Sequence, residues 1–113
     1  MIIDFNSMEE QIMPKFKDGE GALIAKMHSD KDGKILYGIL KPGSSVGYHK
    51  HVTSDEVIYI ISGKADFIYD NDIREEAIAG GCHYCPKGHC HSMINNGPED
   101  LVFFAVVPEL IGY

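Results

Sequence analysis

Residues 43–63 read GSSVGYHKHVTSDEVIYIISG, and residues 80–95 read GGCHYCPKGHCHSMIN. Side chains alternate across a β-strand, so His49 and His51 project to the same face and can converge on one ion. Glu56 lies an odd number of residues after His51, so an unbroken strand would put it on the opposite face. A turn or bulge must therefore come between them, and the letters TSD before Glu56 supply turn chemistry.

Short apolar runs separated by turn residues extend on both sides of these stretches. Many short strands at this spacing indicate an all-β barrel or sandwich. One peripheral helical turn is expected at residues 7–16, where Ser7 could cap it and Pro14 limits its length. We expect strands within ALIAKMH (22–28), ILYGIL (35–40), EVIYIIS (56–62), ADFIY (65–69), IREEAI (73–78), CHSMI (90–94) and LVFFAVV (101–107).

The two quoted stretches resemble the two signature motifs of the cupin superfamily. The first motif is Gly, five residues, His-x-His, three or four residues, Glu, six residues and Gly, and residues 43–63 match every fixed position. The second is Gly, five residues, Pro-x-Gly, two residues, His, three residues and Asn, which residues 80–95 also match. The resemblance implies a double-stranded β-helix, a jelly-roll-like barrel, as a single domain over residues 1–113 with residues 1–20 as an N-terminal extension.

The resemblance to metal-binding cupins also implies a ligand set. It consists of His49, His51, Glu56 and His91, with His91 brought in by the fold after the turn at Pro86–Gly88. Three imidazoles and one carboxylate suit Mn, Fe, Co, Ni, Cu or Zn better than Ca or Mg, so we expect one divalent transition metal per chain. An octahedral ion held by four protein ligands keeps two positions open. Core histidines or a closed structural zinc site are the alternatives.

Strand alternation gives a provisional pocket lining around this site. Ile58 and Ile60 share the face of Glu56, while Met93 and Asn95 share the face of His91. His89 could lie at the barrel mouth beside the metal. The turn before His89 breaks the register of His83, so alternation does not carry His83 to the face of His91. Ordinary core packing explains the same pattern.

Three cysteines raise the question of a second site. Cys82 and Cys85 have C-x-x-C spacing, and Cys90 follows closely. A thioredoxin-type motif should open a helix after a strand, which is not expected here. We therefore expect Cys82 and Cys85 to lie in a strand and pack in the core, with a redox or metal role as the alternative.

An oxygenase acting on a small molecule is the leading functional hypothesis. The two open coordination positions support it, and a metal-dependent isomerase, lyase or decarboxylase is the alternative among enzymes. A non-catalytic, metal-dependent binding module for a small ligand is the alternative from another class. The motifs do not choose among these reactions.

Charge and composition narrow the partners. Seventeen acidic and ten basic side chains give a formal net charge of -7, and no basic cluster favours nucleic acid or an anionic membrane. No apolar run approaches the roughly 18 residues of a membrane span. An odd number of cysteines and no secretory pattern at the N-terminus favour the cytoplasm. Exposed β-edges favour a homodimer.

Overall fold

Two antiparallel β-sheets make up the computed structural model, which describes residues 1–111. Within these residues no helix is both long and apolar enough to cross a membrane. The larger sheet has the order β1-β2-β3-β10-β5-β8, with β1 Gln11–Pro14, β2 Ala22–Asp30, β3 Gly33–Leu40, β10 Leu101–Pro108, β5 Glu56–Ser62 and β8 Cys82–Cys85. The smaller sheet has the order β4-β9-β6-β7, with β4 Ser45–Lys50, β9 Cys90–Ile94, β6 Lys64–Tyr69 and β7 Ile73–Ile78.

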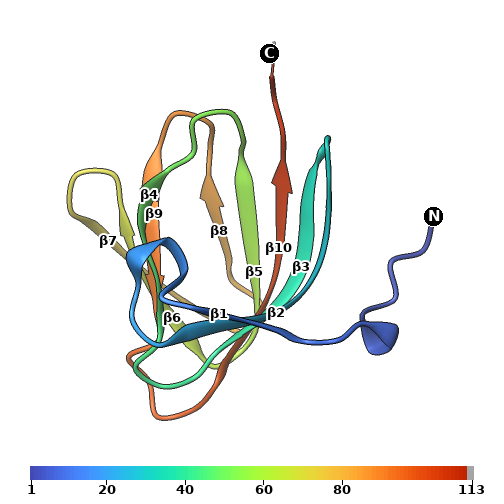
Figure 1. The fold of residues 1–113 in the computed structure, drawn as a ribbon. Helices are drawn as coiled ribbons and strands as arrows, with labels where there is room; N and C mark the ends of the chain where they lie inside the picture. Colours follow the sequence, from blue (N-terminus) through green and yellow to red (C-terminus); the bar gives the residue numbers. More distant parts are fainter. Residues whose placement is uncertain (112–113) are drawn as a thin grey trace.

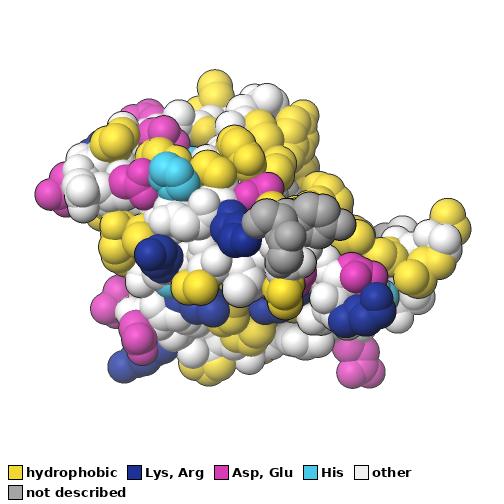
Figure 2. Space-filling view, turned by 90° about the horizontal axis from the view of Figure 1, so that it is seen from above, with side chains coloured by type: hydrophobic (Ala, Val, Ile, Leu, Met, Phe, Trp, Pro, Cys, Tyr) yellow, Lys and Arg dark blue, Asp and Glu magenta, His cyan; other side chains and the backbone are white. Residues whose placement is uncertain are grey.

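The two sheets face each other and form a barrel, whose upper end in Figure 1 carries the loops after β4 and β8. Figure 2 shows the molecule from above, looking at this end. The crossing connections, such as β3 lying beside β10, are those of a jelly roll. The predicted all-β, double-stranded β-helix is therefore confirmed. All seven predicted runs overlap observed strands.

Alternating residues of both sheets fill the barrel. Phe103 and Ala105 of β10 point inward between the half-buried residues that flank them. Phe67 of β6 pairs with Met93 of β9 on the same inner face. The strand period of two thus separates the core from the outer surface.

The helical turn expected at residues 7–16 is wrong in its main part. Gln11–Pro14 is strand β1, which pairs antiparallel with β2 at the edge of the larger sheet. Pro14 has no N–H to donate and is tolerated because it lies on an edge strand. Two short 3-10 helices flank β1: η1 Phe5–Ser7, capped by Asp4, and η2 Phe16–Asp18. The N-terminal segment with η1 lies outside the barrel (Figure 1), where Phe5 packs beside Tyr37 of β3 and Phe104 of β10.

Helix η2 packs against β4 through two glycines. A Cβ on Gly47 would collide with the backbone carbonyl of Lys17, and a Cβ on Gly19 would collide with that of Ser45. Only glycine allows two backbones to come this close. The N-terminal extension is therefore fastened to the strand that carries His49.

Candidate metal centre

Both sheets contribute to the group of His49, His51, Glu56 and His91. His49 lies on β4 directly opposite His91 on β9. His51 follows the end of β4, and Glu56 is the first residue of β5 in the other sheet. The expected turn comes between His51 and Glu56, and it is held by an isolated bridge from Ser54 to Glu109.

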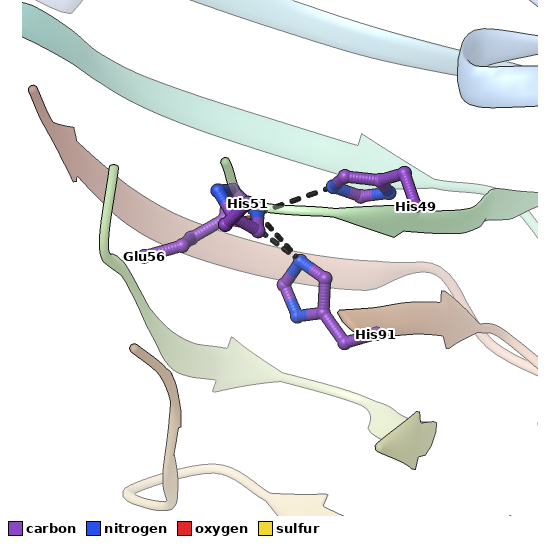
Figure 3. Close-up of side chains that lie close together, drawn as sticks. All are labelled: His49, His51, Glu56 and His91. Atoms are coloured by element: carbon purple, nitrogen blue, oxygen red, sulfur yellow. Dashed lines mark hydrogen bonds and ion pairs between the residues drawn. The ribbon is translucent and has the colours of Figure 1, made fainter. Parts of the chain in front are cut away.

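The ligand-type atoms of these four side chains converge on one point (Figure 3). They all lie within 4.8 Å of one another. Nε2 of His51 is 2.9 Å from Nε2 of His91 and 3.2 Å from Nε2 of His49. Oε1 of Glu56 lies 3.0 Å from Nε2 of His51 and 2.9 Å from Nε2 of His91. Two nitrogens bound to one ion at right angles, each about 2.0–2.1 Å from it, would be about 2.9 Å apart.

The other ring nitrogen of each histidine already has a partner. Nδ1 of His49 donates to the carbonyl of Gly47 at 2.7 Å. Nδ1 of His51 is hydrogen-bonded to Oγ of Ser54 at 2.8 Å, and Nδ1 of His91 to the ring of His83. A neutral imidazole with a proton on Nδ1 presents a lone pair at Nε2. All three rings can therefore present lone pairs to the same point.

The charge state of the group fits a cation. Burial lowers the pKa of His49 to about 4, so this ring is neutral at pH 7. Burial alone would raise the pKa of Glu56, but the close contacts of its carboxylate with the rings of His51 and His91 outweigh burial and lower the pKa to about 2. A neutral imidazole and an ionised carboxylate are the forms that bind metals. Electron-pair donors this close repel one another unless a proton or a cation lies between them.

A family model of the cupin domain matches residues 36–107. The chain belongs to the cupin family. The match contains both histidine-bearing motifs and most of β3 and β10. The resemblance seen in the sequence is thereby confirmed.

This cupin is similar to several known proteins. It is 43% identical over 68 residues to the oxalate-binding protein of Thermotoga maritima, and the alignment covers 60% of this chain and 55% of that protein. It is 30% identical over 93 residues to an uncharacterised protein of Methanocaldococcus jannaschii, covering 67% of this chain and 74% of that one. A Thermotoga maritima crystal structure described as a predicted oxalate decarboxylase superposes with a TM-score of 0.88 at 28% identity, covering 97% of this chain and 100% of that one.

A cavity of about 230 Å³ opens beside the four side chains. Its lining includes Phe103 and two of the residues expected at the pocket, Ile58 and Met93. Lysines from three different segments, Lys17, Lys34 and Lys50, also contribute to the lining. The cavity is below the usual size of sites for drug-sized molecules, so it suits a small ligand.

The other three predicted pocket residues do not line this cavity. Ile60 is fully buried in the core, because alternation along β5 gives the face of a residue but not its depth in the barrel. The side-chain amide of Asn95 donates to the carbonyls of Leu40 and Glu99, each at 2.8 Å. His89 is 2.7 Å from the carboxylate of Asp70.

His83 is the residue that the sequence argument missed. It is buried, and its Nε2 lies 3.0 Å from Nδ1 of His91. Alternation within CHYC could have indicated an inward position, since His83 shares its face with buried Cys85. The link to His91 depends instead on how β8 lies against the other sheet, which the spacing across the turn does not reveal.

The C-x-x-C cysteines lie on opposite faces of β8. Cys85 is fully buried, whereas Cys82 is exposed, and in the described residues both are free thiols together with Cys90. Packing in the core is therefore right for Cys85 and wrong for Cys82. Within residues 1–111 the cysteines join no cluster of metal-binding side chains.

Proposed function

We propose that this cupin binds one divalent transition metal ion through His49, His51, Glu56 and His91. The supporting observation is the convergence of three Nε2 atoms and one carboxylate oxygen, with every Nδ1 engaged elsewhere. Nitrogen and oxygen donors of this kind suit Mn, Fe, Co, Ni, Cu or Zn. When bound, such an ion supplies Lewis acidity or redox chemistry to a coordinated ligand.

The proposed ligand is a small dicarboxylate of the oxalate type. The name of the Thermotoga maritima oxalate-binding protein supports this class, although the alignment spans only 55% of that protein. The cavity of about 230 Å³ is small enough to favour a short ligand. Three lysines, Lys17, Lys34 and Lys50, outnumber the two carboxylates of Glu56 and Glu109 in its lining, in a chain whose net charge is -7. Cationic side chains attract an anion to the site.

Decarboxylation is the reaction that we propose for this ligand, with binding without turnover as the second candidate. The description of the 28% identical structure supports decarboxylation, and the name of the oxalate-binding protein supports binding. The oxygenase hypothesis keeps its basis in the two open positions of a six-coordinate ion. Formate with carbon dioxide would indicate decarboxylation of oxalate, whereas oxygen uptake would indicate an oxygenase.

Metal and oxalate titrations test the proposal. Elemental analysis of untagged protein and calorimetry with Mn(II), Co(II) and Zn(II) should give one ion per chain. His51→Ala and Glu56→Gln should lose it, while His28→Ala, a matched surface histidine, should keep it. Oxalate should then bind to the metal-loaded protein and not to the apo-protein. Equal metal content in all variants would refute the site, and metal binding without oxalate binding would refute the ligand class.

We further propose a homodimer in the cytoplasm. The outer face of the larger sheet carries partly or fully exposed apolar side chains on adjacent strands, among them Tyr37 of β3, Phe104 of β10 and Tyr59 of β5. Phe5 of the N-terminal segment packs beside Tyr37 and Phe104, with ring centroids 6.1 and 6.2 Å away. Contiguous apolar surface of this kind favours association with a second copy.

A further inference from the structure

We infer that His83 and Glu75 are positioning residues that hold the ring of His91 with Nε2 directed to the metal site. The inference rests on the proposed metal centre. Neither residue contributes an atom to the group of four. Both act through His91, whose Nδ1 lies 3.0 Å from Nε2 of His83.

The ring of His83 is held on every side. Its Nδ1 lies 2.8 Å from Oε1 of Glu75. One face stacks on Phe67 with centroids 3.9 Å apart and an interplanar angle of 13°, and Tyr69 meets it edge-on at 5.8 Å. His83 and His91 are only 3% and 2% exposed. A ring so confined cannot turn away to find another partner.

The order of hydrogen-bond donors and acceptors from Glu75 through His83 to His91 determines which ring nitrogens carry protons. An ionised carboxylate only accepts hydrogen bonds, so Nδ1 of His83 donates to Glu75. Nε2 of the neutral His83 ring must then accept, which requires Nδ1 of His91 to donate. Nε2 of His91 is left with its lone pair facing His51 and Glu56. The carboxylate of Glu75 thus selects the tautomer of the buried His91 ring.

The same contacts have a competing structural explanation. β7 and β8 are edge strands of different sheets, and the Glu75–His83 pair joins them where the strand order gives no ladder. If the pair is only a structural clamp that joins β7 to β8, it raises the free energy of unfolding without changing metal affinity. The two roles differ in their effect on metal affinity and on the His91 tautomer.

Three variants separate these roles. His83→Phe keeps an aromatic ring against Phe67 but removes both hydrogen bonds. Glu75→Ala removes the acceptor at a side chain that is 45% exposed, so the fold should survive. Glu75→Gln restores a neutral acceptor. His28→Phe is the matched control, since His28 makes a 2.9 Å pair with Asp30 on the surface, and Asp30 belongs to no metal-ligating group in the described residues.

Metal affinity by chelator competition and histidine ring ¹⁵N spectra of the apo-protein are the measurements. His83→Phe and Glu75→Ala should weaken metal binding about 10–100-fold, as outer partners of metal ligands do, with partial recovery in Glu75→Gln. The His91 signal should change from the pure Nδ1–H form to a tautomer mixture.

Unchanged affinity and an unchanged His91 tautomer, with a lower melting temperature, would overturn the inference in favour of the clamp. If the wild-type protein bound no metal, the proposed function would fail by itself. The apo ¹⁵N spectra would still decide whether His83 orients His91.

Discussion

Nε2 of His51 lies 3.0 Å from Oε1 of Glu56, although His51 follows a strand of the smaller sheet and Glu56 begins a strand of the larger one. His49 and His91 add two more donors from the smaller sheet. An ion held by all four would therefore join the two sheets at one end of the barrel. Unfolding would have to break these bonds.

Metal binding should consequently raise the melting temperature. A ligand present at 100 times its dissociation constant stabilises the folded state by about 2.7 kcal/mol. Since about 1 kcal/mol moves the melting temperature of a domain near this size by about 4–8 °C, we expect a rise of at least about 10 °C. Scanning fluorimetry with Mn(II) or Zn(II), and with EDTA, measures it. Glu56→Gln should show little shift; an equal shift there would contradict the assignment.

Asn95→Ala should destabilise the fold without weakening metal binding. The Asn95 side chain serves the carbonyls of Leu40 and Glu99 and accepts from the N–H of Gly97. Leaving buried groups unpaired costs about 1–3 kcal/mol. Urea denaturation should detect this loss, and Asn96→Ala, at an exposed neighbour, should change stability by less than about 0.5 kcal/mol. Reduced metal affinity with unchanged stability would instead support the expected role of Asn95 in the pocket.

The cysteines should differ sharply in reactivity. Burial, together with nearby acidic groups led by Glu56, raises the pKa of Cys85 to about 12, whereas Cys82 is exposed. At pH 8 a thiol reagent should label Cys82 quickly and Cys85 only after unfolding.

The raised pKa of Cys85 has a consequence for stability. In the unfolded chain this thiol has a pKa of about 8.5, so the free energy of unfolding is unaffected by ionisation of the thiol below that pH and falls as the pH rises toward 12.

The double variant Cys82→Ala/Cys85→Ala should keep the metal. Loss of the metal from a folded double variant would favour the C-x-x-C alternative.

Gly47→Ala should destabilise more than Gly43→Ala. A methyl group at Gly47 meets the backbone of Lys17, whereas one at Gly43 meets nothing within 4 Å. Gly43→Ala then costs only its left-handed backbone, with φ at 84°, which is worth about 1–2 kcal/mol. Chemical denaturation compares the two. Equal losses would mean that η2 moves aside without cost.

The proposed dimer should be broken by a substitution at a single exposed aromatic residue. Tyr59 of β5 is 46% exposed on the outer apolar face, so Tyr59→Glu should convert a dimer into monomers through the cost of burying a charge. Light scattering after gel filtration measures the mass. Ile78→Glu, on β7 of the other sheet, is the control and should leave the dimer intact. A wild-type monomer would contradict the proposal.

The sequence predicted the features that depend on local spacing. The period of two gave the strands and the shared face of His49 and His51, and the parity argument predicted the turn before Glu56. It could not predict depth along a strand, which is why Ile60 and Asn95 were assigned to the pocket. Nor could it predict the pairing of β1 with the edge of β2, because such a pairing is decided by tertiary contacts.

The contact between His83 and His91 joins two strands of different sheets across a turn. Only the closed barrel determines that their rings meet. The same holds for the carboxylate of Glu75, which comes from a third strand. Outer partners of a buried side chain are thus the features least accessible to inspection of spacing.

Phe16, Lys17 and Leu23 line the cavity, yet they precede residue 36, where the cupin-domain match begins. The proposed ion-holding residues and part of the wall that a ligand meets are therefore encoded in different stretches of the chain. Substitutions in this part of the wall can change which ligand is bound while the proposed ion-holding residues stay the same. Exchanging the first thirty residues between two relatives that differ in this part of the wall would therefore give each protein the ligand preference of the other.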